Sequence, residues 1–123
     1  MIDYRGIEKR RFIRAQFPCV IKIYTLHEHI ITTHTENISA GGVRVIIEEK
    51  LEIGSTVGLQ IQIRDHTVSC KGRVVWVVDK KSPYKQGVGY QDTGIEFYEI
   101  KGADIGVINY AIEEIVKNTN IHE

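Results

Sequence analysis

Two short segments of this sequence carry residue types that could bind a charged, planar ligand. The first contains Arg10, Arg11 and Arg14, which precede the first regular element. A guanidinium group is planar and permanently charged, so it can donate forked hydrogen bonds to a phosphate or to the O6/N7 edge of a guanine. This basic arm could therefore act as a clamp on an anion.

The second segment is a polar turn between two strand-like runs, predicted to span Asn37 to Gly42. Asn37 and Ser39 supply an amide and a hydroxyl for specific polar contacts. Gly41 and Gly42 let a ligand approach the backbone closely, and they permit a positive φ. A cationic clamp facing a small polar cradle indicates an anionic ligand that contains guanine.

The spacing of these residues resembles the two-part signature of the PilZ family, whose members are bacterial receptors for cyclic di-GMP. Arg10 and Arg14 resemble its Arg-x-x-x-Arg arm, and Asn37, Ser39 and Gly42 resemble its Asn-x-Ser-x-x-Gly turn. The resemblance extends from the arm to the end of the chain's last predicted helix. It implies an arm that wraps over the nucleotide and a turn that cradles it.

The resemblance also implies a set of site residues. The expected ligand-binding residues are Arg10, Arg11, Arg14, Asn37, Ser39, Gly41 and Gly42, and the possible secondary contacts are Lys9, Arg44, Arg73 and Trp76. In this family the nucleotide binds as one molecule or as an intercalated pair, and the residue before the arginines, here Lys9, influences which. No cofactor besides this ligand is expected.

Length and composition are those of one soluble domain. The chain has 123 residues, of which 42% are hydrophobic and 26% charged, and its formal net charge is zero. No apolar run is long enough for a membrane helix, and the N-terminus lacks a signal peptide's apolar core. The two cysteines are expected to be buried free thiols, so we expect a cytoplasmic protein without membrane insertion.

The charge is unevenly distributed along the chain. Residues 1–14 carry five basic and two acidic side chains, whereas residues 92–123 carry seven acidic and two basic ones. The neutral total does not favour binding to polymeric nucleic acid. The basic head could steer an anion or be a solvated tail, and the paired turn motif favours the first interpretation.

Hydrophobic periodicity predicts six strands followed by one helix. The strands are expected at Cys19–Leu26, Ile30–Glu36, Val43–Ile47, Val57–Ile63, Val68–Val78 and about Gly87–Phe97, and the helix at 103–118. The sixth strand is expected to be interrupted at Gln91–Gly94. Short strands with regular turns, followed by one helix, predict an all-β fold: a six-stranded antiparallel split barrel like that of the PilZ family, with one C-terminal α-helix.

The fifth predicted strand is a long one. Its alternation places Val68, Cys70, Val74 and Trp76 on one face, and Gly72 is expected to mark a bulge or a bend. The predicted domain organisation is a flexible basic arm over residues 1–16, a barrel with its helix over residues 17–118, and a tail over residues 119–123.

The sequence does not point to an enzyme or a metal protein. It has no nucleophile elbow, Walker loop, Rossmann fingerprint or metal-binding helix motif. His27, His29 and His34 invite a metal interpretation, but no further ligands follow at a zinc spacing. We therefore expect neither catalysis nor a metal.

These features lead to one hypothesis with two rivals. The hypothesis is a cyclic di-GMP receptor, a monomer or weak dimer, in which the ligand orders the arm and changes a surface read by a protein partner in motility, biofilm or exopolysaccharide control. One rival is an adaptor of the same fold that binds protein but no nucleotide. The other is a small barrel that binds single-stranded RNA through the arginines and Tyr24, Tyr84 and Tyr90.

Overall fold

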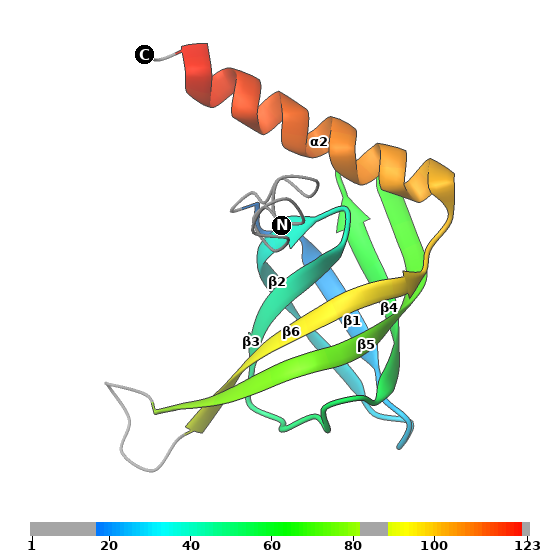
Figure 1. The fold of residues 1–123 in the computed structure, drawn as a ribbon, viewed down its shortest axis with the longest axis vertical. Helices are drawn as coiled ribbons and strands as arrows, with labels where there is room; N and C mark the ends of the chain where they lie inside the picture. The colour runs from blue at the N-terminus through cyan, green and yellow to red at the C-terminus, as the bar shows by residue number, and fades with distance from the viewer. Residues whose placement is uncertain (1–16, 82–88, 122–123) are drawn as a thin grey trace, which may run out of the picture.

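A computed structural model describes residues 17–81 and 89–121 of the chain, which form an antiparallel barrel and one helix (Figure 1). The elements are β1 (Val20–Tyr24), β2 (Ile30–Ser39), β3 (Gly42–Ile47), β4 (Thr56–Ile63), β5 (His66–Lys81), β6 (Gly89–Glu99) and α2 (Gly102–Ile121). The barrel closes in the order β1-β2-β3-β6-β5-β4. The predicted fold class, a six-stranded antiparallel barrel with a C-terminal helix, is confirmed.

The barrel interior is filled by the side chains that alternate along each strand. β4 shows this most clearly, because Val57, Leu59, Ile61 and Ile63 are buried while Gln60 between them is exposed. Such alternation is typical of strands with one face on the core. The same core contains the Cys19 side chain. Both cysteines are free thiols, as predicted, and Cys70 is half-buried.

The helix α2 lies across one end of the barrel (Figure 1). Ile108, Ala111 and Ile112 are buried on the core side of the helix, and Ile115 packs against the same core. The Arg64 guanidinium in the β4–β5 turn forms an ion pair with Glu114 of the helix. The predicted amphipathic helix is thus confirmed, although it begins at Gly102 and extends to Ile121. No helix in the described ranges is both long and apolar enough to cross a membrane.

The predicted position of Trp76 on the core face of β5 is wrong. Val74 pairs with Ile95 and Trp76 pairs with Gly94, so two steps along β5 match one step along β6. This bulge at Val75 reverses the alternation, and the Trp76 side chain lies on the outer surface, 39% exposed. A second register shift, between Lys71 and Gly72, agrees with the irregularity predicted at Gly72.

The predicted interruption of the sixth strand is also wrong, because β6 is continuous from Gly89 to Glu99. Its polar segment lies in the middle of the sheet, where Asp92 pairs with β3 on one side and β5 on the other. Two of the polar side chains have partners, because Arg44 binds Asp92 and the Thr93 hydroxyl donates to the Gln91 carbonyl, whereas the buried Gln91 Oε1 has no hydrogen-bond partner among the described residues. Gly87, where the prediction began, is outside the described residues.

Candidate ligand-binding site

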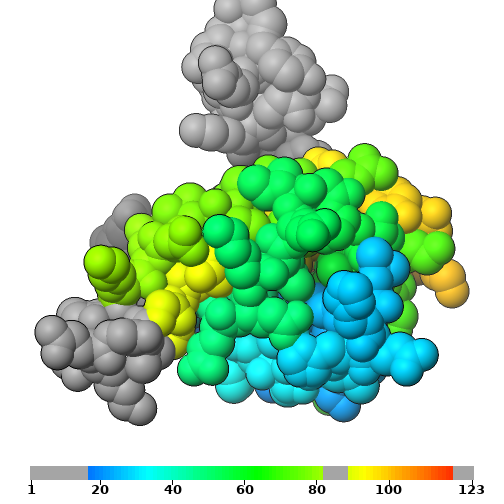
Figure 2. All heavy atoms as spheres, turned by 90° about the horizontal axis from the view of Figure 1, so that it is seen from below, coloured from blue at the N-terminus to red at the C-terminus, as the bar shows by residue number. Residues whose placement is uncertain are grey.

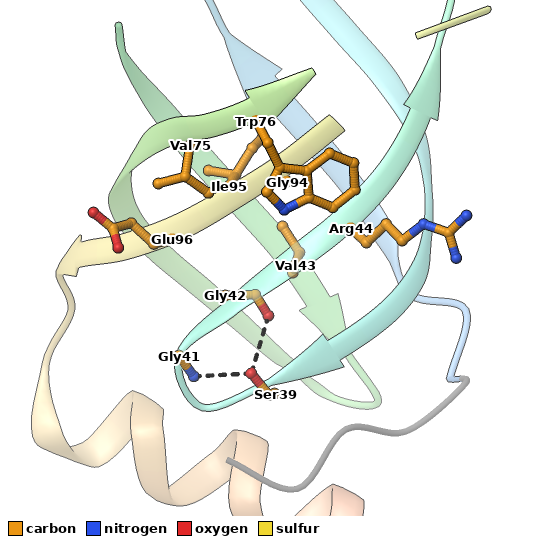
Figure 3. Close-up of a pocket in the computed structure, with 10 residues that line it drawn as sticks. All are labelled: Ser39, Gly41, Gly42, Val43, Arg44, Val75, Trp76, Gly94, Ile95 and Glu96. Carbon is orange, nitrogen blue, oxygen red and sulfur yellow. Dashed lines mark hydrogen bonds between the residues drawn. The ribbon is translucent and has the colours of Figure 1, made fainter. Parts of the chain in front are cut away.

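The predicted cradle is a tighter turn than the sequence indicated. β2 continues through Asn37 to Ser39, only Ala40 and Gly41 form the connection, and β3 begins at Gly42. The buried Ser39 hydroxyl accepts a hydrogen bond from the Gly41 amide at 3.1 Å and donates to the Gly42 carbonyl at 3.5 Å (Figure 3). The Phe97 amide of β6 donates to the Gly41 carbonyl at 2.9 Å. These bonds join the turn to the start of β3 and to β6.

Gly42 is required by the barrel itself. A β-carbon at this position would lie 2.3 Å from the Ile95 carbonyl oxygen and 3.0 Å from the Glu96 α-carbon. Both are backbone atoms, so a side chain at Gly42 would force β3 away from β6. Among the described glycines, only Gly54 has a positive φ. The space left by the missing side chain of Gly42 is therefore occupied by the backbone of the neighbouring strand, β6.

A hollow of about 230 Å³ opens beside this turn. Its lining comes from β2, β3, β5, β6 and the turn itself: Ser39, Gly41, Gly42, Val43, Arg44, Val75, Trp76, Gly94, Ile95 and Glu96 (Figure 3). The indole ring of Trp76 lies over Gly94, whose missing side chain leaves room for it. The bulge in β5 thus presents a flat aromatic surface next to the polar turn, a combination suited to a planar ring with polar edges.

The charges in the hollow nearly cancel. Arg44 and Glu96 are its two charged lining residues. The Arg44 guanidinium donates two hydrogen bonds to the buried Asp92 carboxylate, from Nε to Oδ1 at 2.8 Å and from Nη2 to Oδ2 at 2.9 Å. These bonds raise the pKa of Arg44 further above its usual range. Because Arg44 is already neutralised, an anionic ligand would need cations from another part of the chain.

The structure brings together five of the residues predicted for the site. Ser39, Gly41, Gly42, Arg44 and Trp76 all line the hollow. Two others lie in the described residues but outside that lining. Asn37 is half-buried in β2 opposite Arg44, and the Arg73 guanidinium lies 4.8 Å from the centre of the Tyr98 ring. Lys9, Arg10, Arg11 and Arg14 are outside the described residues.

Sequence reasoning did not identify the β6 side of the hollow. Gly94, Ile95 and Glu96 lie within the predicted sixth strand, and the sequence alone predicted no role in the site for them. A glycine inside a strand pattern does signal a close approach by a neighbour. The neighbour here is Trp76. The bulge that brings Trp76 to Gly94 could not be predicted from the alternation of apolar and polar residues along the strand.

The point where the arm joins the barrel is well anchored. The Thr35 hydroxyl donates to the Phe17 carbonyl at 2.9 Å and accepts from the Cys19 amide at 3.0 Å. The Thr35 amide donates in turn to the Cys19 carbonyl at 2.9 Å. Thr35 is buried in β2, the strand that ends at Ser39. Residues 17–19 are thus fixed to the strand that carries the turn.

The remaining predicted polar groups lie away from this site. His29 Nδ1 is 2.5 Å from Glu49 Oε1. Within residues 17–81 and 89–121, no three His, Cys, Asp or Glu side chains are placed to share a metal ion. The Tyr24 hydroxyl donates to Gln60 on β4, and Tyr90 lies at the start of β6. Tyr84 is outside the described residues.

Comparison with known proteins agrees with this architecture. A family model described as PilZ domain matches residues 8–114, which is most of the chain and includes the arginines of the arm. A search of curated proteins gave no match.

Several solved structures share the fold. The Bacillus subtilis inhibitor of motility MotI/DgrA is 23% identical with a TM-score of 0.71, covering 88% of this chain and 52% of its own. The PilZ domain of Escherichia coli YcgR with c-di-GMP is 10% identical with a TM-score of 0.71, covering 93% of this chain and 96% of its own. K. pneumonia MrkH is 10% identical with a TM-score of 0.76, covering 90% of this chain and 51% of its own. The chain thus spans about half the length of MotI/DgrA and MrkH.

Proposed function

This chain belongs to the PilZ domain family, and we propose that it is a receptor for cyclic di-GMP. In this proposal the nucleotide lies in the hollow beside the β2–β3 turn, with one guanine stacked on Trp76. The Ser39–Gly42 turn and Asn37 contact the guanine or its ribose-phosphate. Arg10 and Arg14 close over the ligand from the other side, and Arg11 adds charge or stacks on a base.

The observation that carries this proposal is that the hollow is smaller and less positively charged than a site for cyclic di-GMP would need to be, so that the basic arm would have to complete it. A volume of about 230 Å³ is below the ~300–1,000 Å³ of sites that enclose a drug-sized ligand. The described lining also offers no net positive charge, because Asp92 neutralises Arg44. A dinucleotide with two phosphates would need both a cover and cations. The basic arm would supply both.

Chain geometry allows the arm to reach the hollow. Thr35, which anchors Phe17, lies four residues before Ser39 on the same strand, a span of ~13 Å at the rise of a strand. Arg10 lies seven residues before Phe17, and seven extended residues span up to ~23 Å. Arg10 can therefore meet a ligand at the turn without any movement of the barrel, whereas the backbone of Arg14, three residues before Phe17, spans up to ~10 Å and its side chain must cover the remaining distance.

We further propose that the ordered arm is the signal. Ordering a segment on binding costs affinity but couples the ligand to a change in surface. A protein partner in motility, biofilm or exopolysaccharide control would then recognise the covered state. The output is proposed to be binding and not catalysis, since the described lining of the hollow holds a neutralised Arg44 and an exposed Glu96 but, among those residues, no nucleophile–base pair.

Trp76 provides a direct test, because it is the chain's single tryptophan. Cyclic di-GMP should change its fluorescence in a saturable titration, and an equal concentration of GTP should not. In Ser39→Ala the turn loses both of its hydroxyl bonds, and the titration should shift to higher nucleotide concentration. A fluorescence signal that does not respond to cyclic di-GMP, with no hydrogen-exchange protection of residues 5–16, would overturn the proposal.

The two rivals predict different outcomes. An adaptor without nucleotide would show neither the fluorescence change nor the protection. An RNA-binding barrel would bind many single-stranded sequences, with an affinity that falls steeply as salt is raised. The tyrosines offer this rival little support, because neither Tyr24 nor Tyr90 lines the hollow at the turn.

A further inference from the structure

A second feature of the barrel lies at the end opposite α2, where β2 and β3 separate. These strands pair from Ser39 and Gly42 only as far as Thr35 and Val45. Beyond that point, β2 from Ile30 to Thr33 pairs with β1 alone among the described residues. The seam between the two strands is therefore open over about half of β2.

The open seam exposes backbone hydrogen-bonding groups. The Thr35 amide donates to Cys19 on the β1 side. Backbone groups of successive residues in an antiparallel strand point to alternate sides, so those of Thr32 and His34 point away from β1, toward the seam. Both side chains are exposed. An exposed strand edge of this kind is a template for pairing with another segment.

A groove of about 590 Å³ follows this seam, more than twice the volume of the hollow at the turn. Its lining combines β2 and β3 side chains with acidic residues: His29, Ile31, Thr32, Thr33, Ile46, Ile47, Glu48, Glu49 and Tyr90. Figure 2 looks onto this end of the molecule, where the β1–β2 connection lies beside the segment that follows β3. The contact between His29 Nδ1 and Glu49 Oε1 joins these two segments across the end of the groove.

We propose that this seam binds an extended, basic segment of a partner protein, which adds a strand to the free edge of β2. Main-chain hydrogen bonds to Thr32 would supply the pairing, because the pairing of Thr35 with Val45 already uses the backbone of His34 opposite Ile46. Ile46 and Tyr90 would receive alternate apolar side chains. Charge identifies the occupant as basic, because Glu48 at the mouth is exposed and neither carboxylate there has a Lys or Arg partner in the described residues. Its position separates this surface from the nucleotide hollow.

The experiment uses the whole chain and a defined probe, the blocked hexapeptide Val-Lys-Val-Lys-Val-Thr, titrated while backbone amides are followed by NMR. We expect saturable shifts concentrated on Thr32, His34 and Ile46. An acidic version with Glu in place of both lysines should bind at least fivefold more weakly. A version with N-methylated backbone amides should not bind, because it cannot complete the main-chain pairing.

Three protein variants separate backbone pairing and charge from folding. Thr32→Pro removes an amide that points into the seam and keeps the β1 side intact, so it should abolish peptide binding. Thr32→Ala keeps the amide and should bind normally. Glu48→Lys should weaken binding of the basic peptide at least fivefold. Each variant should retain the unfolding midpoint of the parent chain to within a few degrees.

Three results would overturn the proposal. One is the absence of peptide shifts along the seam, and another is equal binding of the basic and acidic peptides. The third is a set of shifts at Thr32 and His34 that depends on protein concentration without peptide, which would identify a second copy of this chain as the occupant.

Discussion

The Trp76 indole ring lies directly over Gly94, and a β-carbon at Gly94 would be 2.2 Å from two of the ring's atoms, Cε2 and Nε1. The smallest substitution at Gly94 would therefore displace Trp76, which is the only aromatic side chain among the described residues that line the hollow. Because Trp76 is on the outside of the barrel, the ring can swing away without disturbing the core. This relationship makes the stacking role testable apart from folding.

Gly94→Ala should weaken cyclic di-GMP binding while the protein stays folded. Stacking of a base on an aromatic ring contributes ~1–3 kcal/mol, so we expect an affinity at least about fivefold lower, measured by calorimetry. Gly106→Ala is the matched control, because a β-carbon there meets nothing within 4 Å and the residue lies in α2. Equal affinity in both variants would remove Trp76 from the proposed site.

Arg44→Ala should destabilise the barrel. The substitution leaves the buried Asp92 carboxylate without its two hydrogen bonds, and breaking a buried pair costs ~3–5 kcal/mol, less where one partner is partly exposed as Arg44 is. We expect urea unfolding to show a loss of ~2–4 kcal/mol. Adding Asp92→Asn removes the stranded charge and should restore part of the stability. A double variant less stable than Arg44→Ala would contradict this account.

Thr35→Val should loosen the base of the arm. The valine keeps the shape of the side chain but removes the bonds to Phe17 and Cys19, leaving the buried Cys19 amide without its hydroxyl acceptor, at a cost of ~1–3 kcal/mol. We expect faster hydrogen exchange at the Cys19 amide and weaker nucleotide binding. Thr35→Ser keeps the hydroxyl and should restore both. If the serine variant behaves like valine, the hydroxyl is not what anchors the arm.

Stability should fall at alkaline pH through Cys70. Burial, with a smaller contribution from Asp104, raises the pKa of this thiol from 9.0 to about 11. The folded state therefore holds the proton more tightly than the unfolded state, so this contribution is complete below pH 9.0 and is lost as the pH rises to about 11. The free energy of unfolding of the parent minus that of Cys70→Ala, measured in urea, should therefore decrease as the pH is raised from 8 to 11. A difference that is constant from pH 8 to pH 11 would refute the shift.

The sequence predicted the barrel because its signals were local. β4 and β3 have one buried face, so alternation placed both strands, and the spacing from Ile108 to Ile112 identified the helix. Where long-range pairing decides the outcome, the prediction failed. In the sequence alone, Asp92 indicates an interruption of the sixth strand. Its partner Arg44 is on a different strand, so the pair that allows Asp92 to be buried is known only from the structure.

The sequence identified only part of the candidate site, because the rest of the site also depends on long-range strand pairing. Ser39 and Gly42 are in one short motif, and both line the hollow as the motif indicated. Trp76 reached the hollow through a bulge set by pairing with β6, and periodicity alone placed it on the wrong face. Gly42 had been assigned to ligand approach, yet the close contact it permits is with Ile95. Motifs name the residues of a site, and strand register decides which of them meet.

Isothermal titration of cyclic di-GMP into the purified protein, with Arg14→Ala and GTP as controls, tests the central claim most directly. We expect binding at micromolar affinity or tighter, about −8 kcal/mol or better, with a stoichiometry that distinguishes one bound molecule from an intercalated pair. Arg14→Ala should lose this binding, and GTP should give no heat. No heat with cyclic di-GMP, supported by unchanged NMR spectra at high ligand concentration, would contradict the account and leave protein binding as the function of this fold.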